Sequence, residues 1–144
     1  MADRLFHVYD IPSVNTDGER YDKEYKRAPK WDPDIGDFVR DGSNRIVEAD
    51  GQENYQAWCL KVLQTERFAC LAYEDEIGVE MESALADDDH DTVESMMKRT
   101  ITEALMANPR TIAVTGFSFA WNGDTVRGTC IVRAQEMDDF TVRF

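Results

Sequence analysis

The chain has 144 residues, of which 42% are hydrophobic, so it is long enough for one domain with a core and too short for two. Its 29 acidic residues outnumber the 16 basic ones and give a formal net charge of -13. This charge argues against nucleic acid and anionic membranes as partners, because binding to phosphate requires clustered lysine and arginine.

Residues 1–36 show little regular pattern and are expected to form an irregular N-terminal arm, in which Leu5 to Tyr9 is a short strand. Basic residues predominate between positions 20 and 30, although the chain as a whole is acidic. Two interpretations stay open: an arm that becomes ordered on a partner, and a solvated tail. The basic residues are Arg20, Lys23, Lys26, Arg27 and Lys30.

A regular pattern begins at Asp37 and continues to the end of a first long helix. The stretch from Asp37 to Glu48 has two short apolar runs around Asp41-Gly42, which is typical of a β-hairpin. The run Asp50-Gly-Gln-Glu53 has the spacing of a capping box, so we expect a helix from there to about Thr65, followed by a turn or a short helix to Tyr73. Its inward face would be Tyr55, Trp58, Cys59, Val62 and Leu63.

The middle of the chain is strongly acidic and leads into a second helix. Glu74 to Glu94 contains ten carboxylates and no lysine or arginine, and its Ala86–Asp91 part is expected to be an exposed loop. Asp91 and Glu94 can cap the helix that follows. Asn108-Pro109 should end it, because a residue before proline avoids the α region. The inward face would be Val93, Met96 or Met97, Ile101, Ala104 and Leu105.

The last third of the chain has the pattern of β-strands. We expect strands from Thr111 to Trp121 and from Thr125 to Gln135, joined by an Asn122-Gly123 turn, and a short strand from Phe140 to Phe144. The apolar alternation changes phase at Gly116, which predicts a β-bulge there. The predicted fold is a small α+β domain over residues 37–144, with two main helices packed on an antiparallel sheet.

Carboxylates are numerous enough that an acid/base pair of the glycosidase type has to be considered. Such a pair needs one carboxyl in an apolar setting and a second several ångströms away. Glu66, Glu80 and Glu103 lie nearest to apolar residues, but with 29 acidic residues some fall there by chance. We therefore predict no catalytic residue.

Metal and cofactor sites are also not expected. An EF-hand alignment of Asp87, Asp89 and Asp91 puts Thr92 at the glycine position and Lys98 at the bidentate glutamate position, so it fails at both. The two histidines, His7 and His90, lack the spacing of zinc ligands. Nucleotide-binding and nucleophile motifs are absent from the sequence. The chain is predicted not to be an enzyme and to need no cofactor.

The three cysteines are far apart in the sequence and show no metal-binding or redox spacing. Cys59 and Cys130 lie in apolar patterns and are interpreted as buried free thiols, whereas Cys70 has no evident histidine partner. Free thiols suit a reducing compartment. The N-terminus resembles no signal peptide and no apolar run approaches a membrane span, so synthesis in the cytoplasm is expected.

Two segments resemble one known protein family. Leu63–Gly78 resembles the stretch in which a family helix ends in Leu-x-Thr and a short element leads to a glycine. Arg99–Val114 resembles the family's helix, Glu-Pro-Arg corner and strand. The family comprises contractile-tail baseplate wedge proteins and sheath initiators, including gene product 25 of phage T4 and the TssE component of type VI secretion.

Within that family the chain is most similar to the XkdS-like branch of PBSX-type prophages and phage-tail-like particles. The stretches Phe38–Gly51 and Trp58–Arg67 also resemble that branch, and the resemblance covers about residues 37–135. The sequence departs from the family pattern at one position of this corner: Asn108 stands where the family has glutamate.

The resemblance implies a structural baseplate protein that starts sheath polymerisation by offering strand edges to the first sheath ring. Its partners would be the tail sheath protein, a J-like baseplate wedge protein and other baseplate or hub proteins, with six copies per particle. It would be made in the host cytoplasm and end in the baseplate of a phage tail, a bacteriocin-like particle or an injection machine. Two alternatives stay open: a lysozyme-like peptidoglycan hydrolase and a tail-assembly chaperone.

We hypothesise that Thr111 to Gln135 forms the sheet joined by sheath strands and that Arg110 anchors the protein to the wedge through bidentate hydrogen bonds. Arg110 bound only to its own chain is the alternative. The predicted interface residues are Asn108, Pro109, Arg110, Phe117, Phe119, Trp121, Val126, Ile131 and Arg133.

Overall fold

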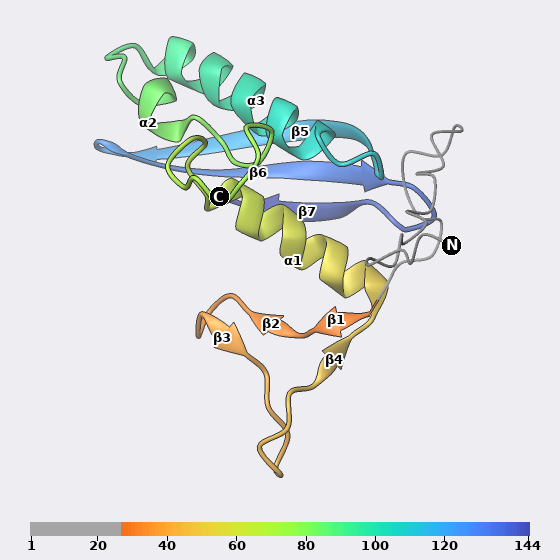
Figure 1. The fold of residues 1–144 in the computed structure, drawn as a ribbon. Coiled ribbons are helices and arrows are strands. Elements are labelled where there is room, and N and C mark those ends of the chain that lie inside the picture. The colour runs from red at the N-terminus through yellow and green to blue at the C-terminus, as the bar shows by residue number, and fades with distance from the viewer. Residues whose placement is uncertain (1–26) are drawn as a thin grey trace, which may run out of the picture.

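The computed structural model describes residues 27–144, so the predicted strand at Leu5–Tyr9 and most of the basic arm lie outside the described residues. Helices α1 and α3 lie along the three-stranded sheet β5-β6-β7, and four short strands form a separate ribbon on the far side of α1 (Figure 1). The predicted α+β class is confirmed.

The β-ribbon consists of β1 (Ala28–Pro29), β2 (Trp31–Asp32), β3 (Asp37–Phe38) and β4 (Glu48–Ala49). β2 pairs with β3 and β1 pairs with β4, both antiparallel. The predicted hairpin is confirmed by the bridge between Arg40 and Ile46. Residues 28–32, which the sequence placed in the irregular arm, pair with this hairpin, and such short strands leave no alternation to detect.

Helix α1 (Gly51–Leu63) begins as the capping pattern predicts, because the Asp50 side chain accepts a hydrogen bond from the Glu53 N–H at 2.8 Å. Trp58 is half-buried, and the other predicted inward residues are buried. The helix ends two residues before the predicted position. The segment that follows α1 folds back so that Val79 lies beside Thr65 and Arg67. Val79 N–H donates to the Thr65 carbonyl at 2.9 Å, and Arg67 N–H donates to the Val79 carbonyl at 2.8 Å.

The acidic stretch forms α2 (Met81–Ala84), a short helix without a predicted counterpart, and then the exposed loop that the sequence predicts. α3 (His90–Met106) follows. The prediction that Asp91 caps this helix was wrong, because the Asp89 carboxylate accepts hydrogen bonds from the Thr92 N–H and hydroxyl. These hydrogen bonds lower the pKa of Asp89. The buried face is Val93, Met97, Thr100, Ile101, Ala104 and Leu105.

The sheet is formed by β5 (Thr111–Asn122), β6 (Thr125–Ala134) and β7 (Phe140–Arg143), all antiparallel, with β6 in the centre. The hairpin loop is Gly123-Asp124, one residue later than predicted, and Gly123 has a φ of 61°. The predicted bulge is confirmed by a register shift between Thr115 and Ser118 and a φ of 61° at Gly116.

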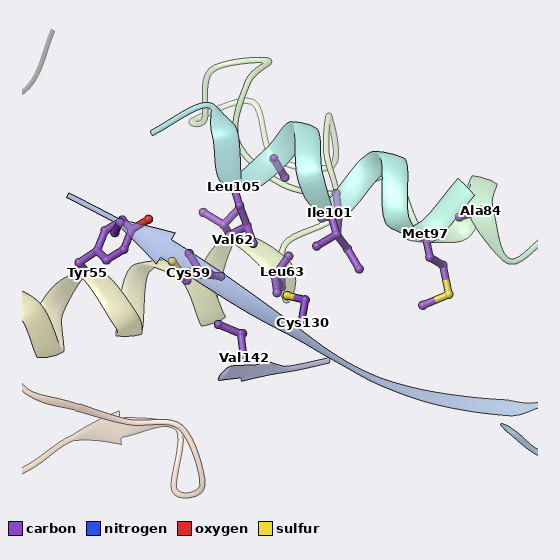
Figure 2. Packing of buried hydrophobic residues seen from close by; sticks show 14 of the residues in the cluster. Tyr55, Cys59, Val62, Leu63, Ala84, Met97, Ile101, Leu105, Cys130 and Val142 are labelled. Atoms are coloured by element: carbon purple, nitrogen blue, oxygen red, sulfur yellow. The ribbon is translucent and has the colours of Figure 1, made fainter. Parts of the chain in front are cut away.

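The core lies between the two long helices and one face of the sheet (Figure 2). Cys130 and Val132 of β6 and Val142 of β7 point to this inner face and pack with Leu105 of α3 and Cys59 of α1. The alternate strand residues point the other way, to an outer face that neither long helix covers. No helix among residues 27–144 is long and apolar enough to cross a membrane.

Candidate protein-binding surfaces

The corner between α3 and β5 is a compact turn formed by Asn108, Pro109 and Arg110. The Asn108 side-chain oxygen accepts a hydrogen bond from the Arg110 N–H at 3.0 Å, as in an Asx turn. Asn108 does not have a left-handed backbone: the non-glycine residues of positive φ in the described chain are Asn44, Phe68 and Glu136. Proline at the next position accounts for this, since it disfavours helical backbone before it.

Thr111 fixes this corner to both long helices. Its buried hydroxyl donates to the Leu105 carbonyl near the end of α3 at 2.6 Å and lies 2.7 Å from the Tyr55 hydroxyl of α1. This role of Thr111 could not be identified from the sequence, because threonine is common in β-strands. A polar residue directly after a Pro-Arg corner was the available signal.

Arg110 is half-buried at the corner and Pro109 is exposed. The Arg110 carbonyl accepts a hydrogen bond from the Gln135 N–H at 2.9 Å, which ties the start of β5 to the end of β6. Asn108 is also half-buried. The three predicted corner residues therefore share one rigid turn with an accessible surface, which suits a docking role.

The predicted aromatic residues of β5 point toward the helices. Phe117 and Phe119 stack with ring centroids 6.3 Å apart, and the Lys98 ammonium lies 5.2 Å from the Phe119 ring. Trp121 stacks on His90 at 3.7 Å, and its indole N–H donates to Glu94 at 3.0 Å. These aromatic side chains are half-buried and hold β5 on α3.

The remaining predicted residues divide between the two faces of the sheet. Val126 lies on the inner face, whereas Ile131 and Arg133 lie on the exposed outer face. Arg133 forms hydrogen bonds with both carboxylate oxygens of Asp139, at 3.1–3.3 Å, and this contact raises the pKa of the guanidinium. The fold thus brings the predicted interface residues into three groups: the corner, the inner face and the outer face.

The sheet has two open edges in the part of the chain that is described. β5 pairs only with β6 there, so one side of its backbone faces no strand. β7 pairs with β6 only over Thr129–Val132 and through Phe144, so the hairpin of β5 and β6 extends past it (Figure 1). Unpaired strand edges accept a strand from another chain by backbone hydrogen bonding.

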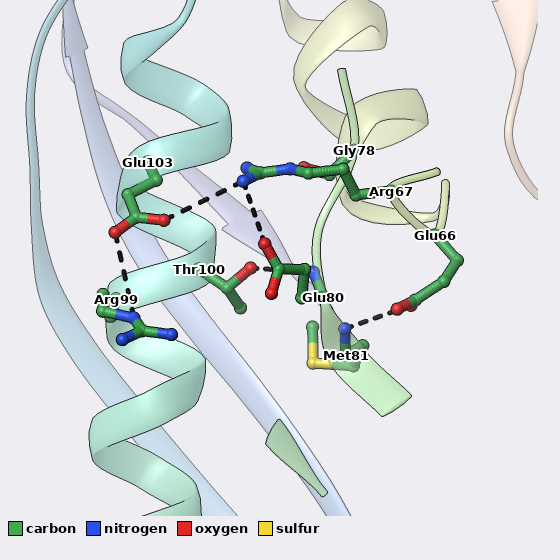
Figure 3. Close-up of polar contacts among 8 residues, drawn as sticks. All are labelled: Glu66, Arg67, Gly78, Glu80, Met81, Arg99, Thr100 and Glu103. Atoms are coloured by element: carbon green, nitrogen blue, oxygen red, sulfur yellow. Dashed lines mark hydrogen bonds and ion pairs between the residues drawn. The ribbon is translucent and has the colours of Figure 1, made fainter. Parts of the chain in front are cut away.

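Two of the three carboxylates considered for catalysis, Glu80 and Glu103, form an ion-pair cluster with Arg67 (Figure 3). The Arg67 guanidinium lies 3.2 Å from Glu80 and 3.9 Å from Glu103, and it donates to the Gly78 carbonyl at 3.2 Å. Glu66 accepts the Met81 N–H at 3.1 Å. Arg67 thus fastens the segment before α2 onto α3, and its importance could not be read from the sequence because its partners are distant in the chain.

Other chemical sites were sought in the described residues. No group of His, Cys, Asp or Glu side chains within residues 27–144 has an arrangement that could hold a metal ion. His7 lies outside that range, and His90 stacks on Trp121. Cys59 and Cys130 are buried free thiols, as predicted, and burial raises their pKa to about 12 and about 11. Cys70 is exposed.

Comparison with known proteins identifies a family and a similar protein. The sequence model of the family described as "Contractile injection system sheath initiator" matches residues 27–137. The chain is also 33% identical over 90 residues to the phage-like element PBSX protein XkdS of Bacillus subtilis (strain 168). That alignment covers 60% of this chain and 62% of the relative, so the chain spans less than two thirds of the relative's length.

Proposed function

Since this chain belongs to the contractile injection system sheath initiator family, as the sequence resemblance predicted, we propose that it is a structural baseplate protein that nucleates the tail sheath. One observation carries the proposal: the β5-β6-β7 sheet is held from one face by both long helices and keeps open strand edges. A rigid sheet with open edges is a template on which a sheath strand can be added.

Strand addition suits the construction of the sheet. β5 has 12 residues, and its half-buried aromatic side chains fix it on α3, so its edge is long and pre-ordered. An edge of this kind also promotes aggregation of identical copies. The net charge of -13 opposes that association through mutual repulsion.

The corner of Asn108, Pro109 and Arg110 is proposed to dock on a J-like baseplate wedge protein. Arg110 directly precedes β5 and its backbone is held at the turn, so its half-buried side chain starts from a fixed position. A planar guanidinium forms paired hydrogen bonds with a carboxylate or with carbonyls of a partner. In this arrangement the corner contacts the wedge and the strand edges contact the sheath.

The test of sheath nucleation is deletion of the gene in the producing bacterium, with complementation by the full-length protein. We expect tubes on baseplates without sheaths in the deletion strain, and sheathed particles after complementation, by electron microscopy. Sheathed particles in the deletion strain would overturn the proposal. A truncation within β6 is a poorer test, because Cys130, Val132 and Val142 belong to the core.

The test of the corner compares Arg110→Lys with Arg99→Lys as a matched control on the exposed side of α3. Lysine keeps the charge but loses the paired geometry. We expect Arg110→Lys to reduce copurification of this protein with the baseplate, while Arg99→Lys leaves it unchanged. Equal copurification of both variants would argue that Arg110 only ties its own chain together.

The alternatives give different results. A peptidoglycan hydrolase would clear cell walls in a turbidity assay and lose that activity in Glu80→Gln, but Glu80 and Glu103 both contact Arg67, which suits a structural role. A tail-assembly chaperone would be absent from finished particles by mass spectrometry. We propose that the protein is present, in six copies, and that it reaches the baseplate after synthesis in the host cytoplasm.

A further inference from the structure

A loop between α1 and α2 exposes hydrophobic side chains that take no part in the core. We call residues 68–76 the apolar loop, and every one of them is exposed. Phe68 is 65% exposed, Tyr73 is 54% exposed and Leu71 is fully exposed. No other stretch of equal length in the described chain exposes three large hydrophobic side chains. Such side chains are ordinary when they are scattered singly, whereas a cluster of them indicates a surface that binds a partner.

The two ends of the apolar loop are fastened together. The parallel bridge between Glu66 and Val79 closes the loop, and the Arg67 guanidinium donates to the Gly78 carbonyl (Figure 3). Gly78 has a φ of 105°, and a Cβ atom there would lie 2.7 Å from the Thr65 carbonyl oxygen, so a side chain could not be accommodated. A loop with fixed ends loses less conformational entropy when a partner binds it.

The backbone of Phe68 is a second, independent observation. Its φ is 67°, in the left-handed region that a bulky residue rarely adopts. Residues strained in this way are concentrated at sites that bind ligands or partners. The Phe68 side chain is largely exposed, so burial within its own chain does little to offset the strain. A partner that enclosed the ring would supply the apolar contact that the free chain lacks.

Negative charge follows directly after the hydrophobic residues. Glu74, Asp75 and Glu76 form no ion pair with a described residue. A partner that suits the loop therefore combines an apolar pocket with lysine or arginine at its rim. A second copy of this chain suits it less well, because the net charge is -13 and the two acidic segments would repel each other. Anionic lipid is disfavoured for the same reason.

We propose that the apolar loop inserts into a hydrophobic pocket of a partner protein whose rim carries lysine or arginine side chains. Phe68 and Leu71 fill the pocket, and the carboxylates of residues 74–76 face the rim. The loop shares no residue with the corner or with the strand edges, so it is a third surface of the molecule. That the partner is another baseplate protein rests on the proposed function. The chemistry of the pocket rests on the loop alone.

The test of the apolar contact compares Leu71→Ser and Phe68→Gly with Leu85→Ser, a matched control that removes an exposed leucine outside the loop. Each variant is expressed in the deletion strain, and its amount in purified baseplates is measured by mass spectrometry relative to the tube protein. We expect both loop variants to be depleted about tenfold or more, because the few side chains that fill a pocket dominate the binding energy. Leu85→Ser should be present at the wild-type level.

The variant Phe68→Gly separates binding from folding. Glycine adopts a positive φ without strain, so urea unfolding should show this variant to be as stable as the wild type or more stable. If Phe68 only supported its own chain, stability and incorporation into baseplates would fall together. Either that result or wild-type amounts of both loop variants in baseplates would overturn the proposal.

The test of the basic rim uses two double variants with the same change in net charge. Glu74→Lys with Glu76→Lys reverses charge in the loop, and Glu82→Lys with Asp88→Lys reverses it at exposed positions elsewhere. Like charges in an interface are strongly unfavourable, so the first should be depleted from baseplates about tenfold or more while the second is not. Equal amounts of the two double variants would contradict a basic rim.

Cys70 reports on the loop in the wild-type protein, because it is exposed and the thiols of Cys59 and Cys130 are buried. We expect N-ethylmaleimide to label Cys70 about tenfold or more slowly in purified particles than in the free chain, because an enclosed thiol is inaccessible to the reagent. Equal rates would show that the loop stays uncovered and would overturn the proposal.

Two measurements on the purified chain examine the other occupants. Sedimentation velocity should show a monomer, and flotation with phosphatidylcholine–phosphatidylglycerol vesicles should show no binding. Self-association or vesicle binding that Leu71→Ser abolishes would overturn the proposal. If the loop variants entered baseplates normally, this inference would fail, and the deletion phenotype would still decide whether the protein nucleates the sheath.

Discussion

At the scale of single residues, the guanidinium of Arg67 connects three parts of the chain. It contacts Glu80 before α2, Glu103 of α3 and the Gly78 carbonyl, and its side chain is only 12% exposed. A buried arginine is retained at a net benefit only when its hydrogen-bond donors are satisfied. Here they are satisfied by groups far apart in sequence, so Arg67 holds tertiary structure and not just a turn.

We expect Arg67→Met to destabilise the protein by about 2 kcal/mol, because the variant leaves two carboxylates close together without their cation. Urea unfolding followed by tryptophan fluorescence measures the change. Arg99→Met is the control, because Arg99 is 64% exposed and its ion pair with Glu103 is solvated. If the two variants lost equal stability, the Arg67 cluster would be no more than a surface ion pair.

The buried thiols give a prediction about pH. Cys59 and Cys130 ionise near pH 12 and 11 when folded, against a usual pKa of 9.0, because burial disfavours the thiolate. Above pH 9 the unfolded chain has therefore lost protons that the folded chain keeps, so stability falls as pH rises toward 11 and is unaffected below pH 8.

We expect iodoacetamide at pH 8 to modify Cys70 in the folded protein and to reach Cys59 and Cys130 only after unfolding, as mass spectrometry of peptides can show. Urea midpoints measured from pH 7 to pH 10 should decline at the alkaline end, and less steeply in Cys59→Ala. Rapid labelling of Cys59 in the native protein would contradict this account.

At the scale of elements, close contact between β6 and the end of β7 depends on a glycine. A Cβ atom added at Gly128 would lie 2.2 Å from the Phe144 ring, which is closer than atoms can approach. Phe144 in turn packs edge to face on Phe119 at 5.9 Å. The bare backbone at Gly128 thus lets the aromatic ring close over the inner side of the sheet.

Gly128→Ala is expected to cost about 2 kcal/mol in the wild-type background, because the added methyl group displaces the Phe144 ring. In a Phe144→Ala background the same change should cost less than about 0.5 kcal/mol, since the obstruction is gone. A double-mutant cycle by chemical denaturation measures the coupling. Equal costs in both backgrounds would place the strain elsewhere.

The long elements were predictable from the sequence because each carries its own periodic pattern. Helical spacing located α1 and α3, and the phase change at Gly116 located the bulge in β5. Elements that depend on distant partners were not predictable. The pairing of residues 28–32 with the hairpin and the short helix α2 follow from tertiary contacts and not from local pattern.

The same distinction applies to the candidate surfaces. The corner at Asn108-Pro109-Arg110 was found because proline and arginine mark it locally. The link from the Thr111 hydroxyl to the Tyr55 hydroxyl was not found, because the two residues are 56 positions apart in the sequence.

At the scale of the whole molecule, the β-ribbon and the helix-covered sheet differ in how much they bury. Among the described residues of the ribbon, Ala49 is the one buried hydrophobic side chain, while Ile35, Phe38 and Ile46 are exposed. The ribbon is attached to α1 by the Lys61 ammonium, 4.5 Å from the Trp31 ring, and by an exposed ion pair between Lys30 and Glu53. Contacts of this kind contribute little stability.

We therefore expect the β-ribbon to open before the sheet unfolds. In hydrogen exchange, the amides of Val39 and Val47, which donate to ribbon carbonyls at 2.9 Å, should exchange much faster than those of Cys130 and Val132, whose side chains are fully buried in the central strand β6. Trp31→Ala removes the cation–π contact with Lys61, so it should accelerate exchange in the ribbon and leave the sheet unchanged. If all four amides exchanged at one rate, in wild type and variant alike, ribbon and sheet would form a single cooperative unit.

A ribbon that opens by itself can be remodelled on a partner at little cost to the sheet, because the core cluster that supports the strand edges begins at Tyr55, beyond the ribbon.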